Sequence, residues 1–259
     1  MKYYSSSISA PVYAKSGVQE HTIDLVIHPK QNGILVINYP GIRATVDGHS
    51  GKYRRIGEIL HDKVGAVVRS SNHKIEDADQ KQYLKDNLRR IIEHSLLNAD
   101  HIAGKSDPDV YLMGVSGGAG AIGAVAYECP LVKKVLMIAP AESAGREDIL
   151  RGLEQFTGEL YITAGENDEL VKKAPEVFHE AAKNAKVRKI VRVPFGDHRF
   201  SGRNGGKIFS KAPLWAFLGE ESYPDPEGGI ELYGGPTTAT KLWQVHVTRE
   251  LGLKGKIRF

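Results

Sequence analysis

Residues 110–118 read Val-Tyr-Leu-Met-Gly-Val-Ser-Gly-Gly, and the small residues Ala119, Gly120, Ala121, Gly123 and Ala124 follow. An apolar run that passes into glycines around a serine predicts a strand that turns sharply into a helix, because glycine leaves room where the two backbones crowd. Ser116 is then expected to stand exposed at the tip of the strand, with the positive N-terminal end of the helix behind it.

Two further strand-like runs are followed by residues that would complete a reactive site. Residues 159–163 lead into a loop with Asp168, and residues 188–193 lead into Pro-Phe-Gly-Asp-His, which ends at His198. A serine hydroxyl is a poor nucleophile until a histidine removes its proton and a carboxylate orients that histidine. The order Ser116, Asp168, His198, each after a strand, therefore predicts nucleophilic catalysis by the serine.

In these motifs the chain resembles the α/β-hydrolase family, over roughly residues 20–219. Members of the family carry a serine, an acid and a histidine in that order on the carboxyl ends of successive parallel strands. The resemblance implies a nucleophile elbow at Ser116 and a catalytic triad of Ser116, Asp168 and His198. Glu166, Glu169 and Asp197 are nearby acids, but only Asp168 has the matching motif position.

Acyl transfer also needs an oxyanion hole of two backbone N–H donors. Gly117, directly after the serine, would supply one of them. By resemblance, the other comes from Gly41 or Ile42, in the loop after the strand predicted at residues 34–38. A plain tight turn would use Pro-Gly at this place as well.

Three arginines follow elements whose ends should face the site. Arg43 follows the oxyanion loop, Arg69 ends a strand and Arg199 follows His198. Together they could receive a carboxylate or phosphate of a substrate. The alternative is that they are solvated or pair with nearby acids.

Strands and helices alternate along the chain, which predicts one α/β domain with a mostly parallel sheet and helices on both faces. A hairpin at residues 8–13 and 21–28 leads it. The region 140–158 has room for one helix, so no large inserted cap is expected. Residues 1–219 would form the core domain, and residues 220–259 a C-terminal extension packed on it and a possible lid. Helices are predicted at 51–62, 78–98, 116–128, 146–156, 169–184 and 238–251, and the remaining strands at 64–69, 110–115, 134–139, 159–163 and 187–193.

Composition narrows the class of protein. A net charge of +4 with acids and bases interleaved argues against a nucleic-acid partner. No run of apolar residues is long enough to span a membrane. A single cysteine, Cys129, and an N-terminus without an apolar signal core favour a cytoplasmic protein. No cofactor or metal motif is required, and oligomeric state is not indicated.

The sequence thus predicts a serine hydrolase that acts on a small-molecule acyl substrate, an ester, thioester or small amide. Two alternatives remain. Gly118, Gly120 and Gly123 match the dinucleotide fingerprint and are followed by Glu142, which would indicate an oxidoreductase. The fold and triad could also serve ligand binding without catalysis, because fold does not fix function.

Overall fold

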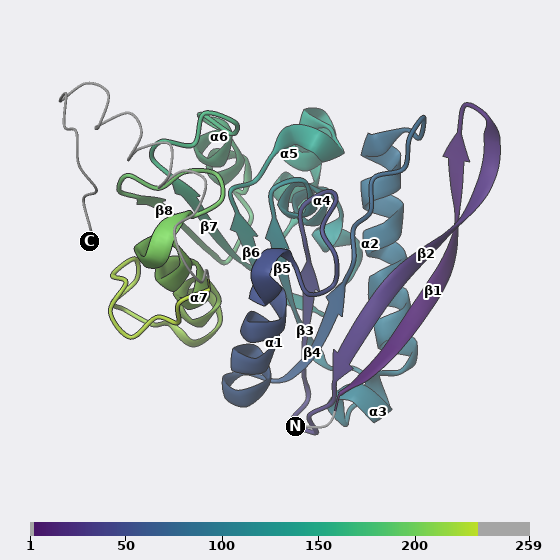
Figure 1. The fold of residues 1–259 in the computed structure, drawn as a ribbon, viewed down its shortest axis with the longest axis horizontal. Coiled ribbons are helices and arrows are strands. Elements are labelled where there is room, and N and C mark those ends of the chain that lie inside the picture. Colours follow the sequence, from purple (N-terminus) through teal and green to yellow (C-terminus); the bar gives the residue numbers. More distant parts are fainter. Residues whose placement is uncertain (1–2, 233–259) are drawn as a thin grey trace, which may run out of the picture.

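A computed structural model describes residues 3–232. In this part of the chain, eight strands form one sheet in the order β1-β2-β4-β3-β5-β6-β7-β8 (Figure 1). β1 (Tyr4–Ala14) and β2 (Gly17–His28) form the predicted antiparallel hairpin, and β2 pairs antiparallel with β4 (Ala66–Ser70). The other pairs are parallel and join β4 to β3 (Ile34–Tyr39), β5 (Asp109–Val115), β6 (Val132–Ile138), β7 (Glu159–Gly165) and β8 (Val187–Val193). The predicted mostly parallel sheet is confirmed.

Helices cover both faces of this sheet (Figure 1). α1 (Lys52–Lys63) and α7 (Gly202–Leu218) share one apolar core with the strands. The opposite core holds α2 (Gln80–Leu97), α3 (Ala99–Ala103), α4 (Gly117–Val125), α5 (Arg146–Gln155) and α6 (Ala174–Ala181). Three short 3₁₀ helices connect these elements: η1 (His49–Gly51), η2 (Ala126–Glu128) and η3 (Glu142–Ala144).

The central strands are apolar because both of their faces are covered. On β3, Leu35 and Ile37 point into the core under α2 and α4, while Val36 points into the core under α1 and α7. Successive strand residues alternate between faces, so a strand buried on both sides reads as a continuous apolar run. The sheet is therefore packed on both faces, and the loops at its carboxyl ends begin from buried strands.

The helix predicted at residues 169–184 is the main error in the expected elements, since α6 begins only at Ala174. The Asp168 carboxylate accepts hydrogen bonds from the N–H groups of Leu170 and Val171. Lys172 then has a φ of 45°, which a right-handed helix does not allow. A tight turn built on Asp168 thus replaces the first turn of the expected helix.

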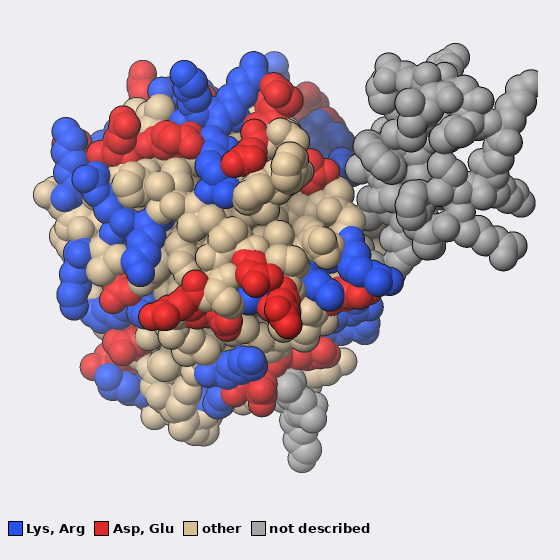
Figure 2. Space-filling model, turned by 90° about the vertical axis from the view of Figure 1, so that its left-hand side faces the viewer, with Lys and Arg blue, Asp and Glu red and all other residues tan. Residues whose placement is uncertain are grey.

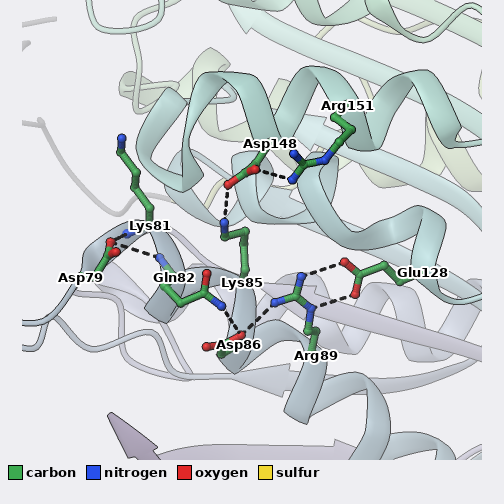
Figure 3. Close-up of polar contacts among 9 residues, drawn as sticks. All are labelled: Asp79, Lys81, Gln82, Lys85, Asp86, Arg89, Glu128, Asp148 and Arg151. Atoms are coloured by element: carbon green, nitrogen blue, oxygen red, sulfur yellow. Dashed lines mark hydrogen bonds and ion pairs between the residues drawn. The ribbon is translucent and has the colours of Figure 1, made fainter. Parts of the chain in front are cut away.

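A cluster of ion pairs joins α2 to α5 and η2 (Figure 3). The Lys85 ammonium donates to the Asp148 carboxylate, which also accepts from Arg151. Arg89 donates to both carboxylate oxygens of Glu128, at 2.7 and 2.8 Å. The Lys85 side chain is 11% exposed, whereas that of Arg89 is 39% exposed. The Lys85–Asp148 pair should therefore depend more strongly on having both partners.

Replacing Asp148 with asparagine is expected to lower the free energy of unfolding by about 2 kcal/mol, because it leaves a largely buried ammonium without its carboxylate. The hydrogen bond from Lys85 holds the pKa of Asp148 below its ordinary value. The difference between wild type and variant should hence be full above about pH 4 and fade as the pH falls through the lowered pKa.

Urea unfolding at neutral and acidic pH measures this difference. The matched control is Glu128→Gln, which breaks the more exposed pair with Arg89 and should cost less than about 1 kcal/mol. Equal losses in the two variants would show that the burial of Lys85 has no energetic consequence.

Residues 220–232 pack against α7 and β7. The ring of Tyr223 stacks on Trp215 with centroids 4.8 Å apart, and its hydroxyl lies 2.7 Å from Thr163 Oγ1. The Lys211 ammonium donates to the Glu227 carbonyl at 2.9 Å, and Leu232 is fully buried. The predicted extension thus begins in contact with the core. The helix predicted at 238–251 and the lid role fall outside the described residues and stay predictions, as does the boundary at residue 219.

β8 forms one edge of the sheet. Its exposed positions include Arg188 and Lys189, charges that discourage pairing with another strand. Figure 2 views the side of the molecule on which β8 and α7 lie and shows basic and acidic side chains interspersed over it. Within residues 3–232, no helix is both long and apolar enough to cross a membrane.

Candidate active site

Ser116 lies between β5 and α4 in a backbone conformation that few residues other than glycine adopt, with φ 54° and ψ −122°. The chain that leaves β3 passes close to the start of α4. A Cβ on Gly118 would lie only 2.3 Å from the Pro40 carbonyl oxygen and 2.4 Å from that of Tyr39. Glycine at this position therefore lets the turn bring the serine to the edge of the sheet. This is the strand–turn–helix geometry that the sequence predicted.

Ser116, Asp168 and His198 meet at the carboxyl ends of β5, β7 and β8. His198 Nε2 lies 3.0 Å from Ser116 Oγ, and His198 Nδ1 lies 2.8 Å from Asp168 Oδ2. With its proton on Nδ1, the histidine donates to Asp168 and presents Nε2 as an acceptor to the serine hydroxyl. This arrangement can take the proton from the serine as its oxygen attacks a substrate.

The loop after β7 fixes the Asp168 carboxylate. Its side chain has no solvent exposure, and Oδ1 accepts the N–H groups of Leu170 and Val171 at 3.1 and 3.2 Å. Oδ2 is thereby turned toward His198. The competing acids Glu166 and Glu169 are exposed.

The carboxylate of Asp197, which precedes His198, binds backbone N–H groups of its own loop. Its Oδ1 accepts the N–H groups of Arg199 and Ser201, at 3.2 and 2.8 Å. These bonds shape the loop that carries His198, while the carboxylate that faces the His198 ring is that of Asp168.

Arg192 on β8 supports the loop at residues 166–173 that carries Asp168, called the acid loop below. This role of Arg192 was not predicted from the sequence. Its guanidinium donates to the carbonyls of Gly165 and Lys172, on either side of Asp168, and to the Glu176 carboxylate. The hydrogen bonds from Arg192 hold the pKa of Glu176 below its ordinary value. An arginine in an otherwise apolar half of a strand was the available signal.

The predicted oxyanion loop lies beside Ser116. A Cβ on Gly41 would be 3.3 Å from Ser116 Cβ, and a Cβ on Gly117 would be 2.9 Å from Ile42 Cγ1. Gly41, Ile42 and Gly117 are therefore gathered around the serine.

Asn72 holds this loop from the end of β4 and was also missed from the sequence. Its side-chain amide donates to the Pro40 carbonyl at 2.9 Å, and its backbone N–H donates to the Ala44 carbonyl at 2.9 Å. The residue is 1% exposed. Its position two residues after a strand, at the same edge as the serine, was the only sequence signal.

Arg69 is not on the rim, contrary to expectation. It is 1% exposed, and its guanidinium donates to Asp47 Oδ1 at 2.7 Å and to the Val46 carbonyl at 2.8 Å. Its Nε also donates to His28 Nε2 at 3.3 Å. Burial, and then the charge of Arg69, lower the pKa of His28 to about 4. The buried Arg69 side chain thus binds the loop at residues 46–47 through hydrogen bonds.

Arg43 and Arg199 are both exposed. Arg43 adopts a φ of 69° and lies near Glu76, whose pKa is lowered by Lys74 first and by Arg43 in addition. Arg199 lies near Lys52 instead, at the start of α1. The three predicted arginines are therefore not brought together into one site.

The glycines of the dinucleotide pattern pack against protein. All nine residues of α4 are buried, and a Cβ on Gly120 would lie 2.3 Å from the Ala141 carbonyl oxygen. Glu142 pairs with Arg146. Close packing of α4 thus accounts for these glycines. Among residues 3–232, no group of three or more His, Cys, Asp or Glu side chains is placed to hold a metal ion.

Comparisons with known proteins bear on the fold. No family model and no curated protein sequence matches the chain. Among solved structures, Est1E from Butyrivibrio proteoclasticus matches 79% of this chain and 95% of its own, with TM-score 0.57 and 15% identity. Dienelactone hydrolase from Anabaena variabilis matches 82% of this chain and 99% of its own, with TM-score 0.60 and 18% identity.

A further match is an alpha-beta serine hydrolase homologue from Coxiella burnetii, with TM-score 0.54 and 16% identity over 74% of this chain and 89% of its own. The chain has the α/β-hydrolase fold that its motifs predicted.

Proposed function

We propose that this protein is a serine hydrolase that cleaves an ester, thioester or small amide through an acyl-enzyme. The observation that carries the proposal is the pair of contacts from Asp168 through His198 to Ser116, at 2.8 and 3.0 Å. The strained backbone of Ser116 supports it, because such strain is retained where the surrounding structure holds a residue for use. Several similar structures are named as esterases or hydrolases, which agrees with the class of reaction.

In the proposed mechanism, His198 takes the proton from Ser116 as its Oγ attacks the acyl carbonyl. The N–H of Gly117 and an N–H from the Gly41–Ile42 loop bind the oxyanion that forms. His198 then gives the proton to the leaving group, and Asp168 stabilises the imidazolium in between. Water then attacks the acyl-enzyme with His198 as base, and His198 returns this proton to Ser116 Oγ as the free acid leaves.

Two large apolar side chains are exposed on the loops that carry the proposed acid and histidine. The acid loop exposes Leu170, at 63%, and the histidine loop exposes Phe195, at 87%. Large exposed apolar side chains on loops that carry reactive groups fit contact with an apolar part of a substrate. Their position supports an acyl or aromatic ester as the substrate class.

Fluorophosphonate labelling with mass mapping tests the proposal, alongside a series of 4-nitrophenyl esters of increasing acyl length. A single adduct on Ser116 and turnover of at least part of the series are expected. An intact protein that gives no adduct and no turnover would contradict the proposal and favour ligand binding without catalysis.

Asn72 offers a test of the oxyanion loop. Asn72→Ala should lower kcat by about ten- to a hundredfold with little change in KM. Without the hydrogen bond to the Pro40 carbonyl, the N–H of the Gly41–Ile42 loop is no longer held in position to bind the oxyanion. The loss corresponds to one buried hydrogen bond that acts in the transition state.

The matched control is Asn32→Ala. Asn32 also donates from its side-chain amide to a backbone carbonyl, that of Val64 at 2.8 Å, but at the opposite end of β3. Steady-state kinetics should separate the two variants. An Asn72→Ala enzyme whose KM rises while kcat is retained would show that the loop binds substrate only.

A further inference from the structure

The acid loop is held in different ways at its two ends. Where it leaves β7, backbone bonds to the chain after β8 fix it: the Glu166 N–H donates to the Val193 carbonyl at 3.0 Å. The Asn167 N–H donates to the Gly196 carbonyl at 2.9 Å. Near the other end, Lys172 has a φ of 45°, a conformation that is strained in residues other than glycine. Such strain persists only where neighbouring groups hold the backbone in place.

The Arg192 side chain holds this strained end. Its Nη1 donates to the Gly165 carbonyl at 3.0 Å, just before the loop, and its Nη2 donates to the Lys172 carbonyl. Nε and Nη2 also donate to the two carboxylate oxygens of Glu176 on α6, at 2.7 and 2.6 Å. A guanidinium can make these contacts together because its donors lie in one plane in fixed directions. Arg192 thus joins both ends of the acid loop to β8 and α6.

The two carbonyls that Arg192 binds lie on either side of Asp168. Within the loop, Asp168 Oδ1 accepts two N–H groups, and the Asp168 carbonyl accepts the N–H of Lys172 at 3.0 Å. Oδ2 is left to face His198 Nδ1 at 2.8 Å. The direction of Oδ2 therefore depends on a loop whose far end is bound by Arg192.

We propose that Arg192 is a positioning residue for the reaction at Ser116. By binding the carbonyls at both ends of the acid loop, it keeps Asp168 Oδ2 at the His198 ring, and Asp168 keeps the histidine proton on Nδ1. Arg192 acts through Asp168 rather than on the reacting atoms. The inference rests on the proposed hydrolase function for its effect on the rate, whereas its effect on the histidine proton does not require turnover.

Arg188 provides the matched control. It lies four residues before Arg192 on β8, so both side chains leave the same face of the strand. Its Nη1 also donates to a backbone carbonyl, but that carbonyl belongs to His179 on α6, at 3.3 Å. Arg188→Met therefore removes a guanidinium and a main-chain bond from the same strand without freeing the acid loop.

The position of the histidine proton is tested by long-range ¹H–¹⁵N NMR on protein labelled with ¹⁵N-histidine, at mildly alkaline pH. The ring signals of His198 are assigned by their loss in His198→Ala. The wild type should carry the proton on Nδ1. In Arg192→Met a measurable fraction should move to Nε2, because a displaced carboxylate no longer holds it. Arg188→Met should match the wild type, and a wild-type tautomer in Arg192→Met would overturn the positioning role.

Steady-state kinetics with the 4-nitrophenyl ester that the wild type hydrolyses best give a second measurement. Arg192→Met should lower kcat by about ten- to a hundredfold and leave KM within about threefold, the effect of one charge-assisted contact that matters in the transition state. Arg192→Lys should recover part of the loss, because an ammonium still donates to a carbonyl. Arg188→Met should stay within about twofold of wild type. Equal losses in Arg192→Met and Arg188→Met, or a rise in KM alone, would contradict the proposal.

Glu176→Gln keeps the test decisive if circular dichroism shows that Arg192→Met does not fold. This variant removes the charge that holds the guanidinium but leaves Arg192 in place. It should move the tautomer and kcat in the same directions as Arg192→Met, by less. A Glu176→Gln enzyme with both unchanged would, in that case, overturn the positioning role.

The two measurements separate the two proposals. A moved tautomer in a protein that turns over no ester would keep the positioning role and reject the hydrolase. Ester turnover with an unmoved tautomer and an unchanged kcat in Arg192→Met would keep the hydrolase and reject the positioning role. A lowered kcat with an unmoved tautomer would also reject it, because the effect would then not pass through Asp168.

Discussion

Replacing Ser116 with alanine is expected to lower kcat by about 10⁴- to 10⁶-fold, and replacing His198 with alanine should have an effect of similar size. The double variant should lose little more than either single one. The reason is that His198 Nε2 acts on Ser116 Oγ, 3.0 Å away, so each residue has no function in the reaction without the other.

The measurement is kcat for whichever 4-nitrophenyl ester the wild type hydrolyses best. Ser201→Ala is the matched control, because Ser201 ends the loop that carries His198, and its loss should change kcat by less than a few-fold. Multiplicative losses in the double variant would mean that Ser116 and His198 act in separate steps. A fluorophosphonate adduct on another serine, such as Ser143 near Gly117, would mean that the nucleophile is misassigned.

Asp168→Asn is expected to lower kcat by about 10⁴-fold while the fold is retained. The amide oxygen should stay at the Oδ1 position, because the N–H groups of Leu170 and Val171 both need an acceptor there. The amide NH₂ then faces His198 Nδ1 and donates to it. The histidine proton is forced onto Nε2, which can no longer accept the proton of Ser116.

Asp197→Asn is the control for this variant. Asp197 adjoins His198 in the sequence, but its Oδ1 accepts backbone N–H groups, a task that an amide oxygen can also perform. We expect kcat to stay within about tenfold of wild type, because a capping bond to a neutral acceptor is weakened rather than lost. Circular dichroism and urea unfolding should show both variants folded. A larger loss in Asp197→Asn than in Asp168→Asn would exchange their assigned roles.

The architecture could be predicted from the sequence because it follows from local patterns of residues. Strands buried on both faces read as apolar runs, as in Ile34 to Ile37, and the parallel pairing follows from their alternation with helices. The candidate triad could be predicted for a related reason, because residues that follow parallel strands lie at the same edge of the sheet. Ser116, Asp168 and His198 each come after such a strand.

Two errors show the limit of local patterns. The helix expected from residue 169 gives way to a turn because the Asp168 side chain captures two N–H groups, a competition that helix periodicity does not register. Arg69 was expected on the rim because it ends a strand. It lies one residue before the end of β4, and a Cβ on Gly57 of α1 would lie 2.6 Å from its Cδ, so it points beneath that helix.

By itself, the sequence determined the order and type of the elements, the elbow at Ser116 and the three residues of the candidate triad, because these depend on periodicity, on glycine and on position after a strand. The tertiary structure alone decided which side chains support the site. Asn72 and Arg192 are far from Ser116 in the chain, and they act through contacts across elements: Asn72 with the carbonyls of Pro40 and Ala44, and Arg192 with the loop that carries Asp168. Such contacts depend on how helices and loops pack over the sheet, and packing is a property of the whole fold rather than of any stretch of sequence.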